Sequence, residues 1–210
     1  MFTDKILSIE ELRAIYAQPN SRAVDKQRPT LDVNSRAFIA LSPFVLMATA
    51  DETGRCDVSP KGDAPGFVRV LDDTHLVIPD RPGNNRLDGL TNLLGNPNIG
   101  LLFLIPGRED TMRVNGKAWI VRDADLLDSL AVDGKAPKTA IGVEIQEVFV
   151  HCPKAFMRSH LWQPEQWPSA RELPSMCEIV WNQLPQKPTE FRDAKEYEAV
   201  LNNLMGKTLY

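Results

Sequence analysis

The chain has 210 residues, of which 43% are hydrophobic, and this suits one large domain, or one domain with helical additions, around a sizeable core. A net charge of −4 without any Lys/Arg cluster argues against a nucleic-acid-binding surface. No apolar run reaches the roughly 18 to 20 residues that span a bilayer, and the first residues lack the pattern of a secretion signal. We therefore expect a cytoplasmic protein that binds neither nucleic acid nor membrane.

The three cysteines, Cys56, Cys152 and Cys177, indicate neither a disulfide framework nor a metal site. Two of them can pair, but reduced thiols are usual in a cytosolic protein. His151 and Cys152 look like half a metal site, yet neighbouring residues on a strand point to opposite faces and no second ligand pair follows. We expect no bound metal.

Residues 1–42 carry helical signals and are expected to form a helical cover over the main domain. A capping-box spacing begins at Ser8, and an apolar stripe of helical period follows it. Residues 21–27 predict a second short helix. Asp32 or Asn34 can cap a turn that carries the next apolar side chains.

From residue 43 to residue 150 the pattern is typical of β structure. Strands are predicted over residues 44–50, 56–60, 67–71, 75–79, 99–105, 111–121 and 141–150. Three hairpin-like connections in a row predict an antiparallel meander, and Gly116 predicts a bulge or a close backbone approach. An antiparallel sheet of six or seven strands avoids exposed edges by closing into a barrel.

Helices are predicted around this sheet. Residues 84–94 place leucines on one helical face, and Gly95, Asn96 and Pro97 stop the helix. Further helices are predicted near residues 124–130, 154–162 and 191–204. The expected fold is a mainly β single domain with added helices (α+β) spanning residues 1–210, in which residues 43–150 form a six- to seven-stranded antiparallel split barrel and residues 151–210 a helical tail.

The turn of residues 83–86, Gly-Asn-Asn-Arg, is the first candidate site. Free N–H groups at a helix start point outward, the helix dipole favours negative charge there, and Arg86 adds a planar fork of donors. These groups suit a phosphate, although the same turn can serve only as a cap. Ser59 and Lys61 share a face of the preceding strand, so a Ser-Lys nucleophile pair is a further hypothesis, but no oxyanion hole or orienting group accompanies it.

Several motifs in residues 44–122, taken in order, resemble the pyridoxamine 5'-phosphate oxidase-like family of FMN-binding split barrels. The motifs are a strand ending in Lys61-Gly62, a strand ending in Ile78-Pro79-Asp80, the Gly-Asn-Asn-Arg turn at a helix start, Asn96-Pro97 before an apolar strand, and a strand that closes on Gly116-Lys117-Ala118. The resemblance implies a homodimer with FMN at the subunit interface.

By that resemblance, one subunit contributes most of the cofactor site. Val58 and Ser59 would lie along the flavin ring, and Lys61 near its pyrimidine edge, where a cation stabilises the charge that reduction places near N1. Pro79 and Asp80 would border the ribityl chain or the ring.

The phosphate and the facing subunit account for the remaining residues. Asn84, Asn85 and Arg86 match the phosphate-binding turn, and Arg81 would supply the cation that Asn85 lacks. From the facing subunit, Thr111 would reach the ring, while Arg158 and Trp162 would cap the flavin.

The resemblance implies an FMN-dependent oxidoreductase acting on an unidentified small organic substrate, and it assigns no catalytic side chain. The arginine-rich C-terminal segment that grips pyridoxamine phosphate in the oxidase proper is missing, so vitamin B6 oxidation is not expected. The alternative is a non-catalytic flavin- or haem-binding or sensing module on the same barrel, since fold does not fix function. Deazaflavin or haem in place of FMN also stays open.

Overall fold

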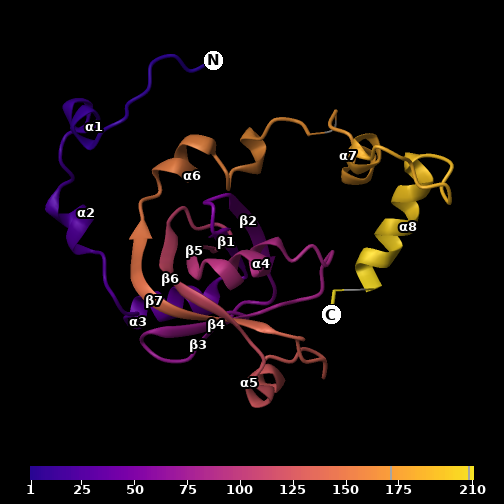
Figure 1. The fold of residues 1–210 in the computed structure, drawn as a ribbon, viewed down its shortest axis with the longest axis horizontal. Coiled ribbons are helices and arrows are strands. Elements are labelled where there is room, and N and C mark those ends of the chain that lie inside the picture. Colours follow the sequence, from indigo (N-terminus) through magenta and orange to yellow (C-terminus); the bar gives the residue numbers. More distant parts are fainter. Residues whose placement is uncertain (171, 208) are drawn as a thin grey trace.

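The computed structural model describes residues 1–170, 172–207 and 209–210, and within them seven strands form one antiparallel sheet (Figure 1). The strands are β1 (Phe44–Ala50), β2 (Cys56–Gly62), β3 (Arg69–Val70), β4 (His75–Pro79), β5 (Asn98–Leu104), β6 (Thr111–Val121) and β7 (Ala140–His151). The expected fold class, mainly β with added helices, is confirmed.

The helices surround this sheet. They are α1 (Ile9–Ile15), α2 (Ser21–Asp25), α3 (Val33–Leu41), α4 (Asp88–Gly95), α5 (Ala124–Ser129), α6 (Lys154–Ser159), α7 (Met176–Gln183) and α8 (Ala194–Lys207), with a 3-10 turn at Pro164–Gln166. Asp32 caps α3 by accepting a hydrogen bond from the Ser35 amide at 2.8 Å, so a helix stands where only a turn was expected. Helix α7 had no counterpart in the sequence prediction.

The predicted meander is wrong, because the strand order is β2-β1-β5-β6-β7-β4-β3. β1 and β2 form a hairpin, as do β3 and β4, but the two hairpins lie at opposite edges of the sheet. β1 pairs with β5 and β4 pairs with β7, so the sheet centre is built from contacts that are distant in sequence. Local turn signals cannot reveal such pairings.

The prediction that the sheet closes into a barrel is also wrong. No ladder joins the edge strands β2 and β3 within the described residues, and the sheet stays open. Figure 1 shows the sheet curved, with α4 inside its concave side. Most residues of the edge strand β2 are exposed, among them Val58 at 64%.

The predicted irregularity at Gly116 is confirmed. The register between β6 and β7 shifts between Asn115 and Gly116. A Cβ atom at Gly116 would overlap the backbone oxygen of Glu144, so the two strands approach as closely as they do only because position 116 has no side chain.

The main core cluster runs from Leu31 to Val148, and most of its members come from the sheet, α3 and α4, with Leu31, Phe67 and Val68 from adjoining loops. Helix α3 buries Phe38 and Ile39 against it. By contrast, α1 and α2 have no buried residue and lie away from the sheet in Figure 1. Residues 1–42 were expected to form a helical cover, and of their helices α3 is the one that packs on the sheet.

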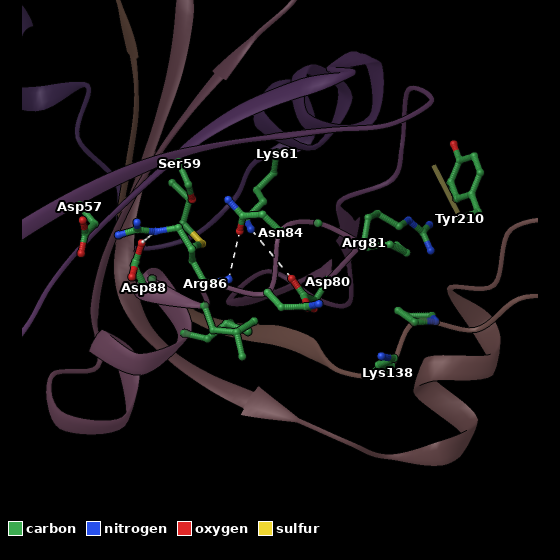
Figure 2. Close-up of a pocket in the computed structure, with 18 of the residues that line it drawn as sticks. Asp57, Ser59, Lys61, Asp80, Arg81, Asn84, Arg86, Asp88, Lys138 and Tyr210 are labelled. Carbon is green, nitrogen blue, oxygen red and sulfur yellow. Dashed lines mark hydrogen bonds and ion pairs between the residues drawn. The ribbon is translucent and has the colours of Figure 1, made fainter. Parts of the chain in front are cut away.

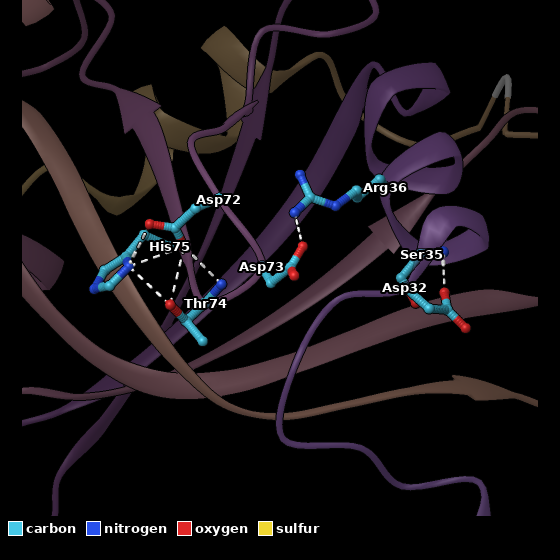
Figure 3. A network of polar contacts seen from close by, with 7 residues as sticks. All are labelled: Asp32, Ser35, Arg36, Asp72, Asp73, Thr74 and His75. Atoms are coloured by element: carbon cyan, nitrogen blue, oxygen red, sulfur yellow. Dashed lines mark hydrogen bonds and ion pairs between the residues drawn. The ribbon is translucent and has the colours of Figure 1, made fainter.

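A network of polar contacts fixes the turn between β3 and β4 beside α3 (Figure 3). The carboxylate of Asp72 accepts hydrogen bonds from the Thr74 amide at 2.7 Å and the Thr74 hydroxyl at 2.9 Å, and it lies 3.0 Å from the His75 ring. These donors lower the pKa of Asp72 to about 2. Arg36 of α3 pairs with Asp73, which ties the turn to the helix.

None of the described helices has the length and the apolar run that crossing a bilayer requires. The three cysteines are free thiols, of which Cys177 is buried and Cys56 and Cys152 are exposed.

Candidate functional site

A cavity of about 590 Å³ lies where β2, the loop after β4, the start of α4 and the loop of residues 135–138 meet. Eight of the residues expected to bind a cofactor line it: Val58, Ser59, Lys61, Asp80, Arg81, Asn84, Asn85 and Arg86. Residues from two strand ends and one turn thus share one cavity.

Strand β2 presents Ser59 and Lys61 to this cavity. Both side chains are half-buried, in contrast to Val58, which is 64% exposed at the sheet edge. The amino group of Lys61 lies 3.9 Å from a carboxylate oxygen of Asp80, which follows β4 (Figure 2). No hydrogen bond joins Ser59 to Lys61 in the described part of the chain, so the Ser-Lys nucleophile hypothesis gains no support.

The Gly-Asn-Asn-Arg turn is a loop that precedes the helix, which corrects the predicted start at residue 84. Helix α4 begins at Asp88, and Asn85 and Leu87 take the left-handed conformation at φ 58° and 61°. The Asn84 side chain stabilises the loop by accepting a hydrogen bond from the Arg86 amide at 3.0 Å. Residues 84–87 therefore offer loop amides and side chains, and the free N–H groups of the helix start belong to later residues.

Arg86 and Asp88 form an ion pair at the mouth of this loop. The Nε atom of Arg86 donates to Asp88 at 2.8 Å, which raises the pKa of the guanidinium above its ordinary value. The Asp88 carboxylate also lies in the first turn of α4, where the helix dipole favours negative charge. The terminal amino groups of Arg86 make no hydrogen bond within the described residues, and its side chain is 72% exposed. They are available to a ligand.

Helix α4 is held against the sheet by a buried amide. Asn92 donates to the Thr49 hydroxyl at 3.1 Å and to the Asp57 carboxylate at 2.8 Å, which links α4 to β1 and β2. At Gly89 a Cβ atom would lie 2.9 Å from the terminal methyl group of Met47, so the helix start packs closely on β1. These contacts fix where Arg86 emerges relative to Lys61.

A second cluster lines the opposite end of the cavity. Arg81 donates to the Asp63 carboxylate at 2.7 Å and to the Leu130 carbonyl at 3.1 Å. The Tyr210 hydroxyl also donates to Asp63, at 2.6 Å. Because Arg81 is held by these partners, its guanidinium is less available to a phosphate than that of Arg86.

Sequence reasoning missed several residues of the cavity. Lys135, Lys138 and Tyr210 line it, and Asp63 anchors Arg81 beside it. No spacing in the sequence connects position 63 with position 210. The one available signal was the pair of lysines around Ala136-Pro137, in a loop directly before a strand.

Four expected site residues do not line the cavity in this chain. Pro79 is buried at the end of β4 and lines a smaller cavity of about 220 Å³ next to it. Thr111 is 4% exposed at the start of β6, opposite His151. Arg158 is exposed on α6, and Trp162 donates from its indole nitrogen to the Arg108 carbonyl at 2.6 Å. Three of these, Thr111, Arg158 and Trp162, were expected to act from a facing subunit.

The family model described as pyridoxamine 5'-phosphate oxidase matches residues 31–152. The match covers more than half of the chain, and the chain therefore belongs to this family. Its bounds enclose the strands and the whole main core cluster. A search of curated proteins found no match.

Solved structures with similarity to the chain include HupZ from Group A Streptococcus, with 19% identity, 57% of this chain and 93% of that chain covered, and a TM-score of 0.46. A protein from Lactobacillus delbrueckii described as a candidate pyridoxamine 5'-phosphate oxidase has 22% identity, coverages of 58% and 95%, and a TM-score of 0.46. An FMN-binding protein from Syntrophomonas wolfei has 13% identity, coverages of 56% and 83%, and a TM-score of 0.45.

Proposed function

We propose that the chain is an FMN-binding flavoprotein, and that it acts as a cytoplasmic FMN-dependent oxidoreductase on a small organic molecule. The observation that carries the proposal is the shared cavity: it receives Lys61 from β2 and Arg86 from the loop before α4. One FMN molecule in this cavity can therefore place its phosphate at Arg86 and its ring beside Lys61.

The cavity fits such a group in size and in its donors. Its volume of about 590 Å³ lies within the range of small-molecule and cofactor sites. The free amino groups of Arg86 give a planar fork for a phosphate, and Asn84 and Asn85 stand beside it. The Asp88 carboxylate orients the fork through Nε and leaves the other donors for the ligand.

When bound, FMN supplies the transfer of hydride or electrons, so the protein has to bind, orient and tune the ring. Lys61 places a cation on the cavity wall, and the half-buried setting strengthens its effect on negative charge. Asp80, 3.9 Å away, holds the Lys61 side chain in place and offsets part of its charge. Val58 and Ser59 provide the surface along which a flat ring lies.

We further propose that a second copy of the chain completes the site. Arg158 and Trp162 do not line the cavity of their own chain, so they would reach a ligand only from a partner, whereas Thr111 is 4% exposed and has little surface to offer one. Val58 is 64% exposed on the edge strand beside the cavity, and apolar surface of this kind favours covering by another chain.

The test begins with the absorbance spectrum of the purified protein and a fluorescence titration with FMN. We expect flavin bands, or saturable binding to the cofactor-free protein. A colourless protein whose spectrum is unchanged after incubation with FMN would remove the proposal.

A second stage separates an enzyme from a binding module. The FMN-loaded protein is reduced with a nicotinamide donor and reoxidised with a panel of small acceptors. Turnover supports the oxidoreductase, whereas binding without turnover across a broad panel supports a non-catalytic module. Haem and deazaflavin are titrated in parallel, and tighter binding of either would reassign the cofactor.

Lys61→Ala tests the tuning role. We expect a lower reduction potential of the bound flavin with a smaller change in FMN affinity, because a cation beside the ring stabilises its reduced form. Lys117→Ala, which removes an exposed lysine of β6, is the matched control. A larger change in affinity than in potential would place Lys61 at the phosphate.

A further inference from the structure

The two ends of the cavity differ in what closes them (Figure 2). Arg86 and Asp88 lie at one end, Lys61 and Asp80 between, and Arg81, Lys138 and Tyr210 at the other end. The inference rests on the proposed function, in which the phosphate takes the Arg86 end and the ring lies toward Lys61. The Tyr210 end then borders the space left for a second molecule.

Tyr210 is held at this end by contacts with three separate segments. Its hydroxyl donates to Asp63, which follows β2, at 2.6 Å. The Lys135 amino group donates to the Tyr210 backbone carbonyl at 3.2 Å. The Arg81 guanidinium lies 5.6 Å from the centre of the Tyr210 ring, a cation–π distance.

The receiving carboxylate is built to accept these donors. The side chain of Asp63 is 3% exposed, and it accepts from Arg81 at 2.7 Å and from the Ala64 amide at 2.7 Å besides Tyr210. Burial acts to raise the pKa of Asp63, but the hydrogen bonds from Tyr210, Ala64 and Arg81 together lower it below the ordinary value. A buried carboxylate loses much when one of its donors is removed.

Tyr210 comes from a part of the chain that is otherwise remote from the sheet. Figure 1 shows α7 and α8 apart from the sheet, with the end of the chain returning toward it. The two helices pack on each other, with the rings of Trp181 and Tyr197 5.7 Å apart. The contact with Asp63 therefore joins the tail to the cavity at a defined point.

We infer that Tyr210 forms the end wall of the cavity and limits the size of the molecule that fits between Lys61 and the loop of residues 135–138. The ring supplies the wall, and its position is fixed by the hydrogen bond to Asp63 and by the Arg81 guanidinium against the ring. Tyr210 is thus a specificity-determining residue supplied by the tail, outside residues 31–152 that match the family model.

The first test uses FMN-loaded protein and the neutral quencher acrylamide. For Tyr210→Ala we expect the quenching constant of bound FMN to rise about two-fold or more, because loss of the ring opens this end of the cavity to the quencher. Tyr210→Phe keeps the ring and loses only the hydrogen bond, so it should lie between wild type and Tyr210→Ala. Tyr16 is an exposed tyrosine at the end of α1, and Tyr16→Ala is the matched control. Its quenching constant should equal that of wild type.

The second test uses cofactor-free protein and backbone hydrogen exchange. In Tyr210→Ala, amides of residues 61–66 and 130–139 should exchange about ten-fold faster, the effect of losing a hydrogen bond to a charged group. Tyr16→Ala should leave these rates unchanged. This readout does not depend on any flavin.

The outcomes separate this inference from the proposed function. If wild type binds no FMN, the proposed function fails, and hydrogen exchange alone decides whether Tyr210 closes the cavity. If FMN binds and Tyr210→Ala matches wild type in both quenching and exchange, the inference is overturned.

Discussion

The sheet with α3 and α4 buries many apolar side chains, whereas the two ends of the chain bury very few. The main core cluster is drawn from residues 31 to 148, whereas α1 and α2 bury nothing and α7 buries only Cys177 among its described residues. Yet α1 and α4 have similar helical patterns in the sequence. A periodic apolar stripe indicates which face of a helix can be buried, but burial also needs a partner surface.

The largest expected effect lies in the core, at the bulge between β6 and β7. Gly116→Ala places a methyl group against the backbone of Glu144, and neither strand can move without breaking the ladder. We expect a loss of about 3 kcal/mol or more in the free energy of unfolding, at the upper end of overpacking effects. Chemical denaturation measures it.

Gly107→Ala is not a suitable control for this change, because Gly107 has a positive φ of 82°. Gly83→Ala is suitable, since no atom lies within 4 Å of the added Cβ. Equal stability of the Gly116 and Gly83 variants would contradict the close approach of β6 and β7.

At the cavity we expect the next largest effect. Arg86→Ala should weaken FMN binding at least about ten-fold, because the phosphate loses a charge-assisted donor fork. Stability should change little, since the side chain is 72% exposed. Arg122→Ala, another exposed arginine, serves as control in the same titration. An FMN affinity unchanged by Arg86→Ala would show that the phosphate binds elsewhere.

A smaller effect is expected at the rim of the core, in the turn between β3 and β4. The folded pKa of Asp72 is lowered from 3.8 to about 2, first by the Thr74 amide and then by its hydroxyl. A carboxylate whose pKa is lower in the folded than in the unfolded chain stabilises the fold at pH values above its unfolded pKa. This contribution is lost as the pH falls from about 4 toward 2. Asp72→Asn should therefore lose less stability over this range than wild type. Identical acid unfolding curves for the two proteins would refute the lowered pKa of Asp72.

The smallest effect is expected outside the core. Leu12→Ser changes an apolar residue of α1, a helix without any buried residue, so the free energy of unfolding should change by no more than about 0.5 kcal/mol. Leu93→Ser on α4, which is 5% exposed, is the comparison and should be far more destabilising. A large loss in the α1 variant would mean that α1 is covered in solution, which would weaken the contrast between the two regions.

The individual strands were predictable because their signals are local. Apolar runs and turn residues located all seven strands, and the lone Gly116 within a strand indicated the bulge. Pairing between strands that are distant in sequence was not predictable in this way. β1 pairs with β5 although β2, β3, β4 and α4 lie between them in the sequence, and no turn signal connects them. The start of α4 was misjudged because Asn85 and Leu87 take left-handed conformations, which delay the helix to Asp88.

In the candidate site, too, residues with local sequence signals could be predicted and residues joined by long-range contacts could not. Lys61 and Arg86 could be identified because each ends or follows a locally recognisable element. Asp63 and Tyr210 could not, since their contact joins positions 147 residues apart. Arg81 was expected to supply a phosphate cation, but its partner Asp63 lies 18 residues earlier and no local pattern predicts that pair.

The most direct test of the central claim compares FMN with riboflavin, which lacks the phosphate, in wild type and in Arg86→Ala. We predict that wild type binds FMN at least about ten-fold more tightly than riboflavin, and that this preference largely disappears in the variant. Equal affinities for the two flavins in wild type, or an undiminished preference in Arg86→Ala, would contradict it.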